Sequence, residues 1–339
     1  MIENSDIVWM ERALQLASLG LGKVQPNPMV GCVIVYKNQI IGEGWHQKYG
    51  GAHAEVNAIN SVKDKSLLSK STLYVNLEPC SHFGQTPPCS DLICKHKIAR
   101  VVIANKDPHE KVNGKGIQQL QSAGIDITVG ILADEGIKLN KRFFTYHLLQ
   151  RPYIFLKWAE TKNGFIDIKR DKNPEFYWIS NQELKVFSHK LRNEEQAILI
   201  GFNTLVNDQP KLTNRLFGSH QPYPFVASNH VLKTPPSPFT IISNEVHQIL
   251  RELHLRKIQS VIIEGGKKTI QNFIDAGIWD EAIVYTGDQE WEDGLLGPNI
   301  DTSNPKIVYK ETQISNNVLK HYILESPLKS KFSDFLSHV

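Results

Sequence analysis

Four residues in the first ninety have the types and spacing of a catalytic metal site. His53 and Glu55 lie in a His-Ala-Glu run, and Cys80 and Cys89 each follow a proline. One imidazole and two thiolates are the three protein ligands that a catalytic zinc ion takes while a fourth position stays open for water. A bound zinc ion lowers the pKa of that water towards 7. Glu55 lies two residues beyond His53, so it can carry a proton from the water to a departing nitrogen without being a ligand.

Each of these residues also has a more ordinary interpretation. A single histidine or cysteine is more often structural than catalytic, and a His-x-Glu run occurs by chance. A closed structural zinc site is a further alternative, but it needs a fourth protein ligand, for which His82 and Cys94 are the near candidates. Cys94 lies five residues past Cys89 in an expected helix and should face mostly away, while His82 in the intervening loop could touch a substrate. The joint occurrence of all the residues favours the catalytic site.

The first 148 residues are expected to alternate strands and helices, which indicates a sheet covered on both faces. An amphipathic helix is expected to begin at Asp6, with the Asp6 side chain as its cap. Strands are expected at 29–35, 40–45, 72–77, 100–104 and 125–129, and helices at 53–62 and 89–97. His53 and both cysteines would then lie where a strand passes into a helix. The N–H groups of a helix start would help to hold the two thiolates.

The motif pattern resembles the zinc-dependent cytidine-deaminase superfamily, whose signature is H-x-E followed by P-C-x-x-C. Here eight residues separate the cysteines, in the string PCSHFGQTPPC. Together with the PNP run at 26–28, this longer form resembles the deaminase half of the RibD family of bifunctional riboflavin-biosynthesis enzymes. The resemblance implies a three-layer α/β/α deaminase domain over residues 1–148. It also implies that Asn27 lies beside the pocket, where its amide could pair with a pyrimidine edge, although Asn serves turns equally well.

A second pattern starts near residue 149. Strands are expected at 152–158, 197–200, 258–263 and 282–285, and helices at 181–192 and from about 267 to 276. Prolines between 216 and 239 are expected to exclude regular structure. The run from Glu264 through Gly265 and Gly266 has the strand, glycine and helix order of a phosphate-binding turn. It is not a GxGxxG run, so a plain glycine-rich connection with solvated lysines is the alternative.

The motifs of this second half follow the order of the reductase half of the same family. The resemblance implies a dihydrofolate-reductase-like α/β domain over residues 149–339 that uses NADPH. It implies that NADPH contacts Ala159, Trp178, Thr204, Asp208, Gly266, Lys267, Lys268, Thr269, Ile270, Gln271 and Asn272. It implies that the substrate contacts Arg192, Leu212, Arg215 and Glu264, and Arg side chains suit a phosphorylated ribose because their forked donors match phosphate. Asp208 is the nearest candidate for an acid or base.

Several positions depart from the reductase pattern. Asn163 and Phe165 replace residues of an S-L-D-G-[KR] run, Phe176 stands where a small polar residue is usual, and Pro224 where a basic residue is usual. The segment near 243–257 is also expected to be short, with one strand absent. A reductase half that serves only as a scaffold beside a working deaminase is therefore an alternative.

Composition restricts the remaining classes of function. The 339 residues, 41% hydrophobic and 22% charged, indicate a folded globular protein of two domains. A net charge of +3 argues against binding to nucleic acid or a membrane surface, and four cysteines are too few for a disulfide scaffold. No signal peptide or membrane span is expected, which predicts a cytoplasmic protein. The oligomeric state, including a homo-oligomer, is left open.

The two resemblances together imply a bifunctional enzyme of riboflavin biosynthesis that acts on a small pyrimidine ribonucleotide. Its first half would deaminate 2,5-diamino-6-ribosylamino-4(3H)-pyrimidinone 5′-phosphate at C2 and release ammonia. Its second half would use NADPH to reduce the ribosyl group of 5-amino-6-(5-phosphoribosylamino)uracil to ribityl. A deaminase for a nucleoside or for a base in tRNA is the other alternative, but an RNA substrate requires a basic approach surface.

Overall fold

The computed structural model describes residues 4–81, 87–168, 177–229 and 238–337. The chain divides into two compact units. Unit 1 consists of Met1–Leu149 together with Leu328–Val339, and unit 2 consists of Gln150–Pro327. The sequence-based division instead assigned the end of the chain to the second half. In the structure Leu328 and Phe332 are buried with residues of unit 1, so the C-terminal helix belongs to the first unit.

Unit 1 is built on a five-stranded sheet in the order β2-β1-β3-β4-β5. β1 is antiparallel to β2 and β3, and β3, β4 and β5 are parallel. Its elements are α1 (Asn4–Ser18), β1 (Gly31–Tyr36), β2 (Gln39–Trp45), α2 (Ala54–Ser61), a 3-10 turn (Lys65–Lys70), β3 (Thr72–Leu77), α3 (Cys89–Lys95), β4 (Arg100–Asn105), α4 (Lys115–Ser122), β5 (Asp126–Val129), α5 (Ala133–Leu139), α6 (Lys141–Leu149) and α11 (Leu328–Ser337).

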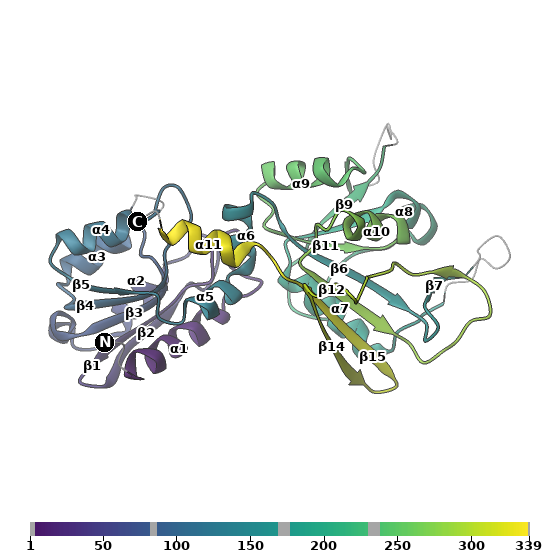
Figure 1. Cartoon of the computed structure of the whole chain (residues 1–339). Coiled ribbons are helices and arrows are strands. Elements are labelled where there is room, and N and C mark those ends of the chain that lie inside the picture. The colour runs from purple at the N-terminus through teal and green to yellow at the C-terminus, as the bar shows by residue number, and fades with distance from the viewer. Residues whose placement is uncertain (1–3, 82–86, 169–176, 230–237, 338–339) are drawn as a thin grey trace. The chain divides into compact units, whose positions relative to one another are not determined.

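Helices cover both faces of this sheet. α1 and α5 lie on one face, and α2, α3 and α4 lie on the other (Figure 1). Met10 of α1 packs with Val33 of β1 in one buried cluster. Ala58, Ile93 and Leu120, from α2, α3 and α4, share the cluster on the opposite face. The unit is therefore the expected three-layer α/β/α arrangement.

Two glycines bring α2 close to the sheet. Gly42 and Gly44 of β2 face α2, and a Cβ atom built on Gly44 would lie 2.3 Å from the backbone nitrogen of Ala58. A larger residue at Gly44 would therefore push α2 away. The close approach fixes the start of α2, where His53 and Glu55 lie, against the sheet.

Unit 2 contains an eight-stranded sheet in the order β10-β9-β8-β11-β6-β12-β15-β14. The strands β10, β9, β8, β11, β6 and β12 are parallel, and β15 is antiparallel to both of its neighbours, β12 and β14. Its elements are β6 (Tyr153–Glu160), β7 (Phe165–Asp167), α7 (Gln182–Glu194), β8 (Ala197–Gly201), α8 (Phe202–Asp208), β9 (Tyr223–Ala227), β10 (Thr240–Ile242), α9 (Val246–Leu255), β11 (Ser260–Glu264), α10 (Lys267–Asp275), β12 (Glu281–Thr286), β13 (Leu295–Leu296), β14 (Ile307–Ile314) and β15 (Asn317–Leu324).

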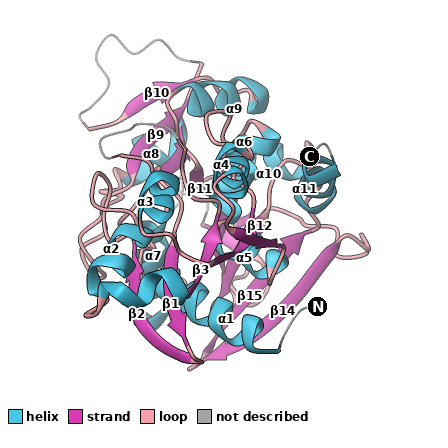
Figure 2. Ribbon diagram, turned by 90° about the vertical axis from the view of Figure 1, so that its left-hand side faces the viewer, coloured by secondary structure: helices cyan, strands magenta, loops and turns pink. Residues whose placement is uncertain are grey.

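The parallel strands at the centre of this sheet are apolar because both faces are covered. Leu191 of α7 and Leu205 of α8 pack on one face. Leu253 of α9 and Phe273 of α10 pack on the other. Figure 2 shows α9 beside β9 and β10. The segment 243–257, which the sequence predicts to be short and to lack one strand, holds α9.

Two local expectations were wrong. Pro224 lies inside β9, although the prolines of this region were expected to exclude regular structure. The N–H of Tyr223 donates to the carbonyl oxygen of Gln196, the residue before the neighbouring strand β8. The nitrogen of Pro224 therefore faces the opposite side, where β10 begins only opposite Phe225. No ladder hydrogen bond is lost there. Asp6 lies within α1 and does not cap it.

The Asp6 carboxylate instead anchors α1 to the sheet. It accepts hydrogen bonds from Arg100 (2.8 and 2.9 Å) and from the hydroxyl of Tyr74 (2.8 Å).

Within the described ranges, none of the helices has the length and apolar character that crossing a bilayer requires.

Candidate active sites

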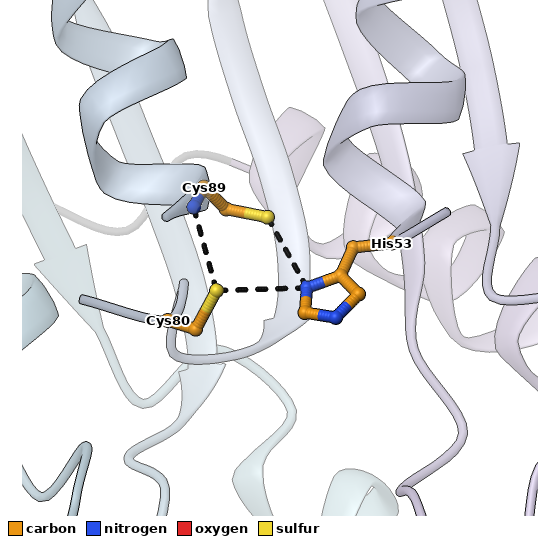
Figure 3. A group of neighbouring side chains, drawn as sticks. All are labelled: His53, Cys80 and Cys89. Atoms are coloured by element: carbon orange, nitrogen blue, oxygen red, sulfur yellow. Dashed lines mark hydrogen bonds between the residues drawn. The ribbon is translucent and has the colours of Figure 1, made fainter. Parts of the chain in front are cut away.

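His53, Cys80 and Cys89 converge on one point of unit 1 (Figure 3). His53 is the residue before α2, Cys80 follows β3, and Cys89 is the first residue of α3. The Nδ1 atom of His53 lies 3.5 Å from Sγ of Cys80 and 3.3 Å from Sγ of Cys89. All three donor atoms lie within 4.8 Å of one another. The three predicted ligands are therefore brought together from separate elements.

This donor set fits a zinc ion. Zinc bonds of about 2.3 Å to sulfur and about 2.0 Å to nitrogen, at tetrahedral angles, place the nitrogen and sulfur atoms about 3.5 Å apart. The observed separations of 3.5 and 3.3 Å agree with that value. In the described part of the chain the cluster holds three residues, and Cys94 is not among them. His82 lies outside the described residues.

Hydrogen bonds favour a thiolate at Cys80. The Cys89 thiol, and then His53, lower the pKa of Cys80 to about 4 against the effect of burial. The backbone N–H of Cys89, at the start of α3, also donates to Sγ of Cys80 at 3.4 Å. The hydrogen bond with Cys80 raises the pKa of His53 to about 9. The hydrogen bond between the two cysteines, together with burial, raises the pKa of Cys89, so the thiolate of the cluster is that of Cys80.

Glu55 lies in the first turn of α2 and is 3% exposed. Burial raises the pKa of Glu55 to about 7, although His53 lowers it. Its carboxyl interacts with the thiol of Cys89, so it lies beside the cluster. A carboxyl with a pKa near neutrality can both accept and donate a proton, as a general acid and base must.

Asn27 forms a pair with His46, a residue that the sequence did not single out. Nδ2 of Asn27 donates to Nε2 of His46 at 3.1 Å, and Nδ1 of His46 lies 3.0 Å from the carbonyl oxygen of Ala52. Burial lowers the pKa of His46, which agrees with a neutral ring that donates from Nδ1 and accepts at Nε2. The His46 ring also meets the His53 ring edge-on, with centroids 5.7 Å apart. Asn27 is therefore next to the cluster.

Two buried asparagines fix the segment that follows Asn27. Asn140 accepts a hydrogen bond from the N–H of Met29 (2.8 Å) and donates to its carbonyl oxygen (2.9 Å). Asn76 donates to the same carbonyl (3.0 Å) and accepts from the N–H of Gly31 (2.8 Å). Asparagine carries one acceptor and two donors in a planar group, so each side chain holds this backbone in one position.

Glu78 is a further residue that the sequence did not reveal as part of the site. Its Oε1 accepts from the N–H groups of Gly116 (2.9 Å) and Ile117 (3.2 Å). Its Oε2 accepts from those of Gly114 (2.9 Å) and Asp107 (3.2 Å). The carboxylate therefore binds the start of α4, where unpaired N–H groups favour negative charge. Glu78 lies two residues before Cys80, so this anchor is close to the ligand loop.

In unit 2 the glycine turn meets α8. β8 and β11 are neighbouring parallel strands, so the turns that follow them lie at one edge of the sheet. The N–H of Gly266 donates to Oγ1 of Thr204 at 3.1 Å. Gly265 has φ +111°, and a Cβ atom there would lie 2.9 Å from the side chain of Thr204. The start of α10, with Lys267 in its first turn, fits a phosphate group of a dinucleotide.

A charged cluster lies at the end of β11. Glu264 accepts from Lys157 (2.8 Å) and from Nη2 of Arg192 (2.9 Å). Burial alone would raise the pKa of Glu264, but Arg192 and Lys157 outweigh it and lower the pKa to about 2. Lys157 also lies over the ring of Tyr285, 5.0 Å from its centroid. Lys157 and Tyr285 were not predicted from the sequence, because isolated residues in apolar strands carry no motif.

Arg192 has an unused donor. Its Nη1 donates to the carbonyl of Thr213 (3.2 Å), and its buried Nε has no hydrogen-bond partner among the residues that the structure describes. An unpaired guanidinium N–H in a buried position is costly and suits an anionic or hydroxyl-bearing ligand. The backbone N–H of Arg215 donates to Nδ1 of His189 at 3.1 Å, which places Arg215 beside α7. Leu212 is buried in the cluster that contains Leu191.

The remaining residues that the sequence assigned to the cofactor differ in exposure. Trp178 is 60% exposed, with Lys185 over its ring at 4.4 Å. Ile270 is fully buried in the core, so its side chain is not open to a cofactor. Gln271 donates to Asp275 and binds the backbone of Asn299. Ala159 and Thr269 are half-buried, and Asp208, Lys268 and Asn272 are exposed.

Two residues that depart from the reductase pattern, Asn163 and Phe165, lie in the described part of unit 2. Nδ2 of Asn163 donates to the carbonyl of Trp291 (2.7 Å), and its Oδ1 accepts from the N–H of the same residue (3.2 Å). An aspartate could not make the first of these bonds, so the amide has a structural use here. Phe165 begins β7, and Phe176 lies outside the described residues.

Known proteins resemble both units. Residues 3–105 match the cytidine and deoxycytidylate deaminase zinc-binding region, and residues 152–287 match the RibD C-terminal domain. The riboflavin biosynthesis protein RibD of Aquifex aeolicus (strain VF5) is 36% identical over 326 residues, which covers 87% of this chain and 90% of the relative. The chain belongs to the RibD family.

Solved RibD structures share the whole fold. A diaminohydroxyphosphoribosylaminopyrimidine deaminase/5-amino-6-(5-phosphoribosylamino)uracil reductase from Thermotoga maritima superposes with a TM-score of 0.82 at 34% identity, covering 94% of this chain and 99% of the other. RibD of Acinetobacter baumannii gives 0.84 at 28% identity, with 95% and 99% covered.

RibD membership confirms the expected fold classes, a cytidine-deaminase-like domain and a RibD reductase domain. The chain is a bifunctional enzyme of riboflavin biosynthesis with deaminase and reductase domains. Zinc and NADPH are the cofactors of these two domains.

Proposed function

We propose that the deaminase substrate is the diamino pyrimidinone ribosyl phosphate and that His53, Cys80 and Cys89 hold the zinc ion. The observation that carries this assignment is the convergence of three donor atoms within 4.8 Å beside the buried Glu55. Zinc, when bound, lowers the pKa of a water molecule at its open position. Glu55 accepts the proton of the attacking water and donates it to the departing amine, which leaves as ammonia.

Asn27 and His46 orient the pyrimidine in this proposal. His46 fixes one end of the Asn27 amide, and Asn76 and Asn140 fix the backbone that follows it. A ring positioned by a preorganised amide reacts faster because less freedom is lost in the transition state.

In unit 2 we propose that the phosphorylated ribosyl group binds at Arg192, Arg215, Leu212 and Glu264. Arg192 offers its free Nε, and Lys157 and Glu264 lie next to it. NADPH supplies the hydride when it is bound at the start of α10 and beside Thr204. Of the two cations that donate to Glu264, Lys157 lies slightly closer, with its Nζ atom 2.8 Å from the carboxylate. Asp208, the acid or base candidate from the sequence, is exposed at the end of α8.

The substrate is, in this proposal, a small pyrimidine ribonucleotide and not a nucleic acid, and the reaction takes place in the cytoplasm. A net charge of +3 supports the first part, because RNA binding depends on a strongly basic surface. A nucleoside or tRNA deaminase would instead turn over cytidine or bind a structured RNA at moderate salt.

The experiment that tests the proposal is incubation of the purified chain with the diamino pyrimidinone ribosyl phosphate, with and without NADPH. We expect ammonia and the deaminated uracil derivative in both cases, and the ribityl product only with NADPH. Products are identified by mass. Normal ammonia release without NADPH consumption would favour a reductase half that serves as a scaffold, and no ammonia release would refute the deaminase assignment.

A further inference from the structure

Helix α11, although it follows unit 2 in sequence, contributes to the core of unit 1. Leu328 is 6% exposed and Phe332 is 4% exposed. They share a buried cluster with Leu77, Ile137, Phe143 and Phe144. The rings of Phe332 and Phe144 meet edge to face, with centroids 5.3 Å apart and planes at 83°. Figure 1 shows α11, in yellow, beside α6 of the same unit.

A second contact joins α11 to the end of β4. Nζ of Lys106 lies 4.5 Å from the ring centroid of Phe335, a cation–π distance. Lys106 is only 6% exposed, so this contact holds a buried cation. Lys106 directly precedes Asp107, whose N–H donates to Glu78.

Both contacts lead to Glu78. Leu77, which packs in the cluster with Phe332, is the residue before Glu78. Lys106 packs directly on Gly114: a Cβ atom built on this glycine would lie 3.0 Å from Cε of Lys106. The N–H of Gly114 in turn donates to Glu78. The Glu78 carboxylate is therefore supported by α11 from two directions.

The Glu78 anchor in turn fixes the segment that leads to Cys80. A Cβ atom at Gly116 would lie 2.0 Å from the carbonyl oxygen of Pro79, so α4 begins in direct contact with that residue. Four N–H groups converge on a carboxylate that lies two residues before Cys80. A shift of this loop would move the Cys80 sulfur.

We propose that α11 is a positioning element of the deaminase site. Phe332 holds Leu77, Phe335 holds Lys106, and both thereby hold Glu78 and the loop of Cys80. The alternative is that α11 only covers apolar surface without influence on this loop. The proposal rests on the proposed function for its activity measurement, because it takes Cys80 as a ligand.

Hydrogen exchange in the full chain tests the inference without reference to activity. In Phe332→Ala and Phe335→Ala, we expect the amides of Gly114, Gly116 and Ile117 to exchange at least ~10-fold faster, because the Glu78 anchor opens more often. The conservative Phe335→Tyr should restore slow exchange, and Lys331→Ala, an exposed position of the same helix, should leave it unchanged. Exchange at the normal rate in both alanine variants would overturn the proposal.

The kinetic measurement separates positioning from loss of fold. We expect Phe335→Ala to lower kcat for deamination by about 10-fold with KM nearly unchanged, because the reacting groups and not the binding surface are displaced. Reduction of externally supplied deaminated intermediate should keep its normal rate. Unchanged kcat would contradict the inference. If the unaltered chain does not deaminate, the proposed function fails, while the exchange result still decides the role of α11.

Discussion

Lys157 and Glu264 occupy paired positions of the neighbouring parallel strands β6 and β11, and their side chains form a 2.8 Å ion pair. Arg192 reaches the same carboxylate from α7 at 2.9 Å. Strand register thus places the Glu264 carboxylate beside Lys157, and α7 adds a second cationic side chain, Arg192. The pair is mostly buried, with side chains 11% and 16% exposed, so its electrostatic effect is not lost to solvent.

This pairing predicts a pH dependence of stability. The folded-state pKa of Glu264 is about 2, below its usual value of 4.5, so the folded chain releases this proton more readily than the unfolded chain. The stabilisation is complete above about pH 5 and is lost as pH falls towards 2, on the order of 3 kcal/mol in total. Glu264→Gln should flatten the fall in the free energy of unfolding of unit 2 between pH 5 and pH 3, measured by denaturant titration. Glu292→Gln, at an exposed position, should keep it.

Glu55→Gln tests the proton carrier. The amide keeps the shape of the side chain but cannot take up a proton, so deamination should fall by at least ~10²-fold while zinc content stays normal. Elemental analysis and ammonia release provide the two measurements. Glu11→Gln, exposed on α1, is the matched control. Normal turnover in Glu55→Gln would remove this residue from the mechanism.

Cys89→Ala tests the ligand set. Mutation of residues that only hydrogen-bond to metal ligands weakens metal binding by ~10–100-fold, and loss of a direct ligand should weaken it more. The metal should therefore be lost on dialysis against a chelator. Cys94→Ala should retain the metal, because Cys94 is not in the cluster. One zinc per chain in dialysed Cys89→Ala would contradict the assignment.

Arg215→Ala tests the phosphate site of unit 2. Removal of one charged donor to phosphate should raise KM for the reductase substrate by about 10-fold, with deamination unchanged. Arg251→Ala removes an exposed arginine of α9 and should change neither reaction. An unchanged KM in Arg215→Ala would indicate a surface role.

Asn140→Ala tests the backbone clamp on Met29. It leaves a buried N–H without its partner, which costs about 1–3 kcal/mol of stability. The Asn27 loop should also lose its position, so KM for the deaminase substrate should rise more than kcat falls. Asn60→Ala, exposed on α2, is the control. Equal kinetics in both variants would show that the clamp does not serve binding.

Much of the architecture could be predicted because local pattern and local structure agree. The run at 72–77 is apolar and β-branched and forms β3 with those limits, and Lys37 and Asn38 form the expected turn with positive φ. The convergence of His53, Cys80 and Cys89 could be predicted because the two cysteines each follow a proline in a string that resembles a known zinc-site motif.

Other features depend on contacts that sequence does not display. Pro224 is tolerated in a strand only because the neighbouring strand starts one position later. Glu78 looks like an ordinary acid until four N–H groups from residues 107–117 surround it. His46 and Lys157 become site residues through partners that are distant in the chain or on another strand.

The return of α11 to unit 1 also determines the order in which the chain can be completed during synthesis. All of residues 150–327 leave the ribosome before Leu328 and Phe332 do. Until then, Phe144 and Leu77 lack two of their buried neighbours. The unit that is translated first can therefore complete its core only after the whole of unit 2 has been translated.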